Sequence, residues 1–160
     1  MPMLSIMENN EMRQAELLAA RAEVAPWVDY PANPWWWPVA GGAWAVTFAF
    51  AVSADSALST ALFWLAVLAE LGWFWWVRRR WGAWPRLGSM PPEFHRPAAG
   101  FVIGLLAVVG LAMLLHPVDV AVSTAVLALG VSGVLAWYDL AYARASERTA
   151  ARLGTTARVR

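Results

Sequence analysis

The sequence predicts an all-α, polytopic membrane protein with four transmembrane helices in two tight hairpins, preceded by a short N-terminal cytoplasmic helix. Of its 160 residues, 60% are hydrophobic and 14% are charged, whereas ordinary soluble domains carry about 25% charged residues. The apolar residues form long continuous blocks instead of a stripe at helical or strand spacing, which is typical of membrane spans. All twelve basic residues are arginine, and all lie outside those blocks.

These blocks divide the chain into three parts. Residues 1–34 form a polar, cytoplasmic N-terminal lead, residues 35–143 a four-helix transmembrane domain, and residues 144–160 a basic cytoplasmic tail. The length allows one domain.

The lead is expected to hold one short helix. Asn10 is a suitable N-cap, and the weakly amphipathic pattern ends near Ala22. Pro26, Pro31 and Pro34 follow, and proline disfavours helix both at its own position and at the residue before it. We therefore expect an extended approach to the membrane.

The first hairpin is predicted to pair spans at about 36–54 and 58–77. A run of three tryptophans, Trp35 to Trp37, suits the headgroup level, where an indole ring is apolar and its N–H stays wet. The first span rises about 28 Å at helical pitch, close to the thickness of the hydrocarbon layer. The residues between the spans leave room only for a tight turn.

The second hairpin is predicted to pair spans at about 98–115 and 120–142, joined by a tight turn at His116 to Asp119. Gly100 and Gly104, four residues apart, allow a neighbouring helix to approach closely.

The last helix is expected to continue into the tail. Arg144, Arg148 and Arg152 share one helical face at four-residue spacing. Gly154 is the predicted stop, because glycine tolerates the left-handed conformation that ends many helices.

Arginine counting predicts the orientation. The lead carries two arginines, the loop after the second span five and the tail five, while the two short turns carry none. Arginine and lysine accumulate on the cytoplasmic side of membrane proteins. We therefore expect a multi-pass protein of the plasma membrane with both termini and the 78–97 loop in the cytoplasm.

Glu70 is the single charged residue of the predicted span at about 58–77. Asp139 lies close to the cytoplasmic end of the last span, where the arginines at 78–80 or Arg144 are expected to compensate it. A charged group at a helix centre costs about 2.5–3.5 kcal/mol on insertion scales, so intramembrane acids are often functional. One interpretation is a proton- or cation-binding site, with Trp73 one turn away as an aromatic wall. The other is a protonated, structural glutamic acid that hydrogen-bonds a neighbouring helix, where Ser132 is expected at similar depth.

The arginines beside the membrane predict contacts with anionic lipid headgroups, at roughly 1 kcal/mol per basic residue. The predicted headgroup contacts are Arg78, Arg79, Arg80, Arg86, Arg144, Arg148 and Arg152. Nucleic acid is not expected, because the tail is short and topology already accounts for its arginines.

No pattern predicts catalysis, a metal or a cofactor. The chain has no cysteine, which excludes thiolate ligands and thiol nucleophiles. His116 and Asp119 supply at most half of a metal site. Glu93, His95 and Arg96 have no nucleophile arranged around them.

The sequence thus favours a non-enzymatic accessory or interaction subunit that packs against itself or another membrane protein. The alternative is a small oligomeric proton- or cation-coupled transporter that uses Glu70.

Overall fold

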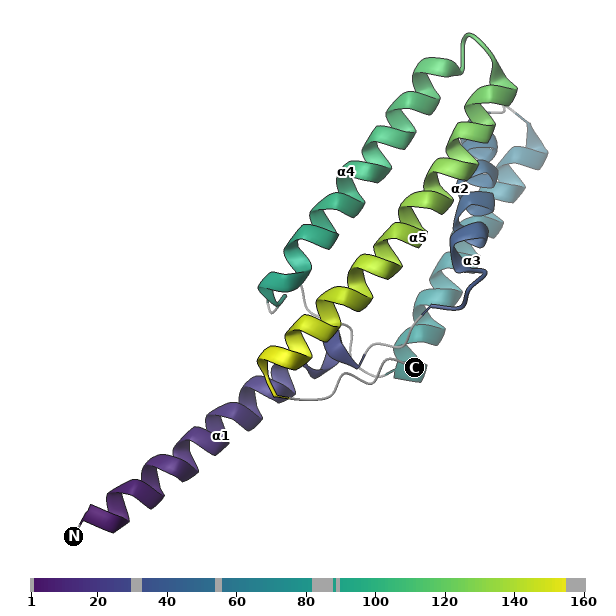
Figure 1. Cartoon of the computed structure of the whole chain (residues 1–160). Coiled ribbons are helices and arrows are strands. Elements are labelled where there is room, and N and C mark those ends of the chain that lie inside the picture. The colour runs from purple at the N-terminus through teal and green to yellow at the C-terminus, as the bar shows by residue number, and fades with distance from the viewer. Residues whose placement is uncertain (1, 30–32, 54–55, 82–87, 89, 155–160) are drawn as a thin grey trace.

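The computed structural model describes residues 2–29, 33–53, 56–81, 88 and 90–154, and in these residues it is all-helical (Figure 1). Its five helices are α1 (Pro2–Val28), α2 (Trp37–Ser53), α3 (Ala57–Trp81), α4 (Pro92–Leu115) and α5 (Val120–Arg152). The predicted all-α class is confirmed. The expected turn at Asp55, the headgroup contact of Arg86 and the last six residues lie outside the described residues.

Three helices are long and apolar enough to cross a membrane: α3 over Ala57–Trp76, α4 and α5. The chain is therefore a membrane-embedded protein by length and composition. Helix α2 is also apolar but has 17 residues, which corresponds to about 26 Å at helical rise.

The four apolar helices form an open row in the order α4, α5, α2, α3 (Figure 1). Helix α5 packs against both α4 and α2, and α3 packs on the other side of α2. Helices α3 and α4 are thus the two edges of the row. Helix α1 extends away from the row as a rod, and its C-terminal end meets the last turns of α5.

Glycines let α4 and α5 pack closely. A Cβ at Gly100 would clash with the ring of Trp137, and a Cβ at Gly104 would come within 3.1 Å of Val134. A neighbouring helix does pack against these two glycines, but side chains of α5, and not its backbone, fill the space. Small residues serve the same purpose in membrane helix pairs generally.

Helices α2 and α5 meet through backbone as well as side chains. A Cβ at Gly42 would overlap both the Ala128 carbonyl oxygen and the Ser132 Oγ atom. Gly42 is also one of the two buried residues of α2, with Ala51. This position fixes how closely α2 can approach α5.

Aromatic pairs join α2 to α3. Trp37 stacks on Trp73 with ring centroids 5.2 Å apart and an interplanar angle of 20°, and Phe48 contacts Phe63 at 5.7 Å. Because these contacts pair the start of α2 with the end of α3, the two helices run antiparallel.

Three helix boundaries differ from the sequence expectation. Helix α1 begins at Pro2, so Asn10 lies inside it and the expected N-cap there is wrong. The helix also continues to Val28 with Pro26 inside it, so the expected break at Pro26 is wrong. Helix α4 begins at Pro92 instead of residue 98 and contains Pro97. Each proline removes one backbone hydrogen bond, but both lie near a helix end whose neighbouring side chains, Trp27 and Phe94, are buried together.

Two predicted boundaries are confirmed. The turn at 116–119 joins α4 to α5, and the Asp119 carboxylate caps α5 by accepting a hydrogen bond from the Val122 N–H at 3.0 Å. Helix α5 runs through Arg152, and Gly154 adopts a φ of 62°. That left-handed conformation favours glycine and ends the helix.

We expect Gly42→Ala to destabilise the protein. Overpacking by the added methyl group costs about 1–3 kcal/mol. Alanine has a better helix propensity than glycine, but only by roughly 1 kcal/mol. The net loss of stability should lower the Tm in detergent by about 2–6 °C. Gly110→Ala is the matched control, because a Cβ there has no neighbour within 4 Å. An equal Tm for the two variants would contradict the close α2–α5 approach.

Candidate functional site

The structure places Glu70 and Trp73 on α3 but Ser132 on α5, with α2 between them. Ser132 Oγ lies against Gly42 of α2, and Trp73 stacks on Trp37 of α2. Glu70 and Ser132 therefore sit at similar depth along the row, but on different helices that are separated laterally. The structure does not bring these two residues together.

Glu70 occupies the stripe of α3 that faces α2. That stripe follows the spacing of 4, 3, 4 and 3 residues through Ser59, Phe63, Ala66, Glu70 and Trp73, which is one helical face. Ser59 and Ala66 are buried, whereas Glu70 is exposed. Within the described residues Glu70 has no hydrogen bond or ion pair, so its carboxyl remains available to a group from outside the chain.

An aromatic cluster lies beside Glu70 at the basic end of α3. Trp37 stacks on Trp73, and Trp73 contacts Trp76 with centroids 5.3 Å apart. The Arg79 guanidinium lies 5.1 Å from the Trp75 ring centroid in a cation–π contact. Arg78 and Arg79 are exposed, and the side chain of Arg80 lies outside the described part of the chain.

A cluster of buried hydrophobic side chains lies where α1, α4 and α5 meet, a region called here the α1–α4–α5 junction. Trp27 of α1, Phe94 of α4 and Ala145 of α5 form its core, packed with Met90 and Tyr142. Phe94 is 1% exposed, and its ring lies 5.2 Å from that of Trp27 and 4.8 Å from that of Tyr142. The Trp27 indole N–H is buried there and has no hydrogen-bond acceptor among the described residues.

The C-terminal ends of α1 and α5 overlap antiparallel and cap each other. Tyr142 donates its hydroxyl to the Trp27 carbonyl at 2.7 Å, and Ser146 donates to the Val28 carbonyl at 3.1 Å. In return, Arg21 donates from Nε and Nη2 to the Leu153 carbonyl, at 3.2 and 2.9 Å. The last carbonyls of a helix have no partner within it, so each helix supplies the donors that the other lacks.

An ion pair ties α4 to the end of α5. Arg152 donates to Glu93 at 2.7 and 3.3 Å, and the Glu93 side chain is 16% exposed. Glu93 precedes the uncharged stretch of α4 that begins at Pro97.

Asp139 of α5 accepts a hydrogen bond from Asn33 Nδ2 at 2.7 Å. The sequence suggested Arg144 or the arginines at 78–80 as its compensation, and the structure uses the amide that precedes α2 instead. This bond joins the C-terminal half of α5 to the segment that enters α2.

The sequence reasoning missed the α1–α4–α5 junction. The signal was present, because Tyr138, Tyr142, Ala145 and Thr149 continue the α4-facing stripe of α5 beyond the predicted span at helical spacing. Thr149 is fully buried. A stripe of tyrosines and small residues that outlasts the hydrophobic block indicates packing against protein instead of lipid.

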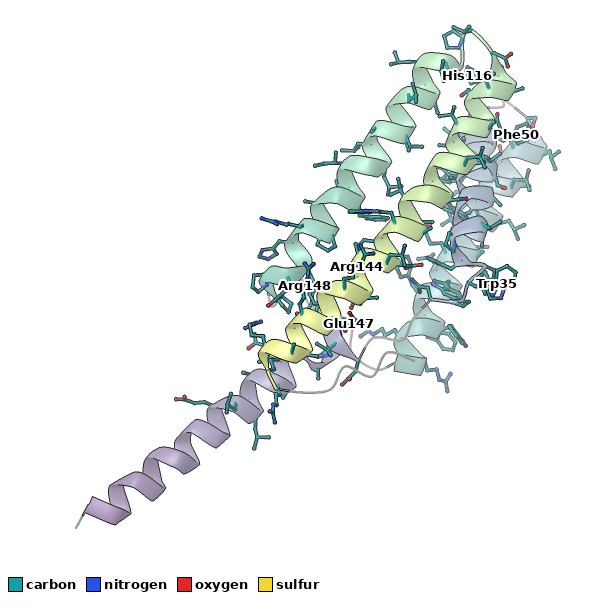
Figure 2. The ribbon with its side chains drawn as sticks, in the orientation of Figure 1. Trp35, Phe50, His116, Arg144, Glu147 and Arg148 are labelled. Atoms are coloured by element: carbon teal, nitrogen blue, oxygen red, sulfur yellow. The ribbon has the colours of Figure 1, made fainter. Side chains whose placement is uncertain are left out.

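The basic residues gather at one end of the row, which we call the basic end. Figure 2 shows Arg144 and Arg148 at this end and His116 at the opposite one. In the described residues, no group of three or more histidines, cysteines or acids could hold a metal ion.

The chain was compared with family models, with curated proteins and with solved structures, and no match was found in any of the three. The functional argument therefore depends on the site's own chemistry. Two features provide side chains with such chemistry. They are the exposed Glu70 on the α2-facing stripe and the exposed arginines near the α1–α4–α5 junction.

We expect removal of the capping hydroxyls to loosen α1 without disturbing the row. Tyr142→Phe and Ser146→Ala each delete one hydrogen bond worth about 0.5–1.5 kcal/mol net. Amide exchange at residues 21–28 should accelerate about twofold to tenfold for each change, as measured by hydrogen–deuterium exchange.

Thr124→Val is the control, because the Thr124 hydroxyl bonds the Val120 carbonyl of its own helix, far from the junction. Unchanged exchange in residues 21–28 for the double variant would show that these bonds do not hold α1.

Proposed function

We propose that this chain is a four-span protein of the plasma membrane that acts as a non-enzymatic accessory or interaction subunit. Helix α2 would be the fourth span, since Trp35 and Trp36 extend its apolar stretch to headgroup level. The segregation of arginines at the basic end supports a cytoplasmic location for both termini and for the 78–97 loop.

The observation that carries this proposal is the open row of helices. Only 11% of the α3 span window and 6% of the α4 window are buried by the chain itself. No membrane-embedded cluster of polar side chains forms a site in the described residues, and the two edge helices remain available to a neighbour. Such a row is suited to packing against another membrane protein.

The two edges are chemically different, and α3 is the better partner surface. The exposed side chains of α4 within the span are aliphatic, such as Val102, Ile103 and Leu106, and lipid tails satisfy them. Helix α3 exposes Glu70 together with several tryptophans, namely Trp64, Trp75 and Trp76. An acid in a span calls for a protein or aqueous partner, so we assign the interaction surface to α3.

The alternative is an oligomeric proton- or cation-coupled transporter that uses Glu70. It is supported by the exposure of this carboxyl on the α2-facing stripe, one turn from the Trp37–Trp73 stack. Aromatic faces attract cations, and a second copy would have to complete the pathway, because one open row encloses none.

Purification from native lipid followed by mass spectrometry tests the proposal. We expect the tagged chain to carry one stoichiometric membrane-protein neighbour, identical or different. Photo-crosslinkers at Leu71 and Phe74 of α3, both exposed and next to or one turn from Glu70, should capture it, whereas crosslinkers at Ile103 and Leu106 of α4 should capture lipid. An isolated monomer with no α3 crosslink would overturn the interaction role.

Substitution of Glu70 separates the two candidates. Glu70→Gln keeps hydrogen-bonding capacity but cannot exchange a proton, so an interaction subunit should retain its assembly. A transporter should lose proton-dependent uptake or ligand binding in proteoliposomes with Glu70→Gln and keep part of it with Glu70→Asp. Loss of assembly in both variants would show instead that the carboxyl is part of the contact.

A further inference from the structure

The arginines at the basic end are divided between protein partners and open positions. Arg21 binds the Leu153 carbonyl and Arg152 binds Glu93. Arg144 and Arg148 are exposed and, among the described residues, make no hydrogen bond or ion pair to the protein. Their guanidinium groups are free to bind an external anion.

These two arginines lie on one stripe with a tryptophan. Residues 137, 144 and 148 are related by seven and four positions, which places them on the same face of α5. Helical rise puts about 10 Å between the first two and about 6 Å between the arginines. Figure 2 shows Arg144 and Arg148 on the last turns of α5, near the start of α4.

The position of Trp137 is set by α4. Its ring fills the space above Gly100, yet the side chain remains 47% exposed. Indole rings favour the boundary between acyl chains and headgroups, with the apolar body toward lipid. The stripe therefore offers an aromatic surface at that boundary and two guanidinium groups beyond it.

None of the nearby acids in the described residues forms an ion pair with Arg144 or Arg148. Asp139 is hydrogen-bonded to Asn33, and Glu93 is paired with Arg152. Glu147 is exposed, and in the structure it forms no ion pair with Arg144 or Arg148. Two guanidinium groups one helical turn apart can each donate two hydrogen bonds to one phosphate.

We propose that Trp137, Arg144 and Arg148 form a binding site for one anionic phospholipid, whose phosphate lies between the two arginines and whose acyl chain lies along Trp137. This site is more specific than general attraction of the basic end to a negative membrane surface. It assigns lipid binding to two residues of the tail and excludes Arg152, which holds Glu93.

Native mass spectrometry of the full chain, titrated with phosphatidylglycerol or phosphatidylcholine, tests the site. We expect one tightly bound phosphatidylglycerol. Its affinity should fall about fivefold for Arg144→Gln or Arg148→Gln and about 25-fold for both, since each basic residue near the surface contributes comparably. Phosphatidylcholine should bind weakly to all variants.

Two controls separate this site from general charge effects. Arg79→Gln removes an equal charge from α3 and should leave the tight lipid bound, whereas Glu147→Gln should leave or strengthen it. Circular dichroism melting in neutral detergent reports whether each variant is folded. Equal losses in Arg79→Gln and in the Arg144/Arg148 double variant would mean nonspecific attraction and would overturn the site.

Inorganic phosphate distinguishes a lipid from a free anion. Inorganic phosphate at about 10 mM is in large excess over the protein and its bound lipid. It should not displace that lipid. Full displacement would identify a phosphate site and overturn the assignment to phospholipid. The lipid site and the interaction role can fail separately in this assay, because it uses the isolated chain. A monomer that still binds the lipid would contradict the interaction role and leave the lipid site standing.

Discussion

Helix α5 is the element on which the rest of the structure depends, because it packs extensively against α4 and α2 and also contacts the end of α1. Its first half holds α4 and α2 through glycines and small side chains, which allow close approach where lipid offers no hydrophobic driving force. Its second half leaves the apolar region and holds α1 through hydroxyl and guanidinium donors. One continuous helix of 33 residues therefore links the membrane-embedded row to the polar N-terminal helix.

The two kinds of packing follow from the surroundings of each part. Inside the row, contacts are mainly apolar, and the closest ones occur at glycines such as Gly42 and Gly100. At the end of the row opposite the basic end, Ser123 Oγ of α5 donates to the Ala112 carbonyl of α4 at 2.7 Å. Most other polar contacts between helices in the described residues lie at the basic end, where the carbonyls of two helix ends would otherwise need water. Reciprocal capping there satisfies acceptors that no intrahelical bond can reach. The chain thus fixes its basic end firmly and leaves the edges of the row open.

The helices were predictable from the sequence because hydrophobic blocks and turn residues are local signals. Gly154 and the 116–119 turn end and join helices as expected. Pro26 and Pro97 were misread because local propensity opposes helix at proline, whereas the burial of Trp27 against Phe94 is a tertiary effect. Tertiary packing commonly overrides such local preferences.

The lateral order of the helices was not predictable. A single sequence indicates how deep each residue lies in the membrane, but not which helices are neighbours. Glu70 and Ser132 were expected to be within reach of each other at similar depth, and α2 separates them. The arginine face of the tail was predicted as a unit, yet the structure commits Arg152 to Glu93 and leaves Arg144 and Arg148 open. Partner choice among like residues depends on which helix lies opposite, and only the fold provides that.

The open row is the central claim, and a distance between its edges tests it most directly. The chain has no cysteine, so spin labels can be attached at Leu68→Cys on α3 and Leu106→Cys on α4 in dilute nanodiscs. Neighbouring helix axes are 8–10 Å apart, and three such spacings separate α3 from α4 in the open row. Pulsed electron–electron double resonance should therefore give a distance between the two labels above about 20 Å. A single population near one interhelical spacing, about 10 Å, would mean a closed bundle and would contradict the account.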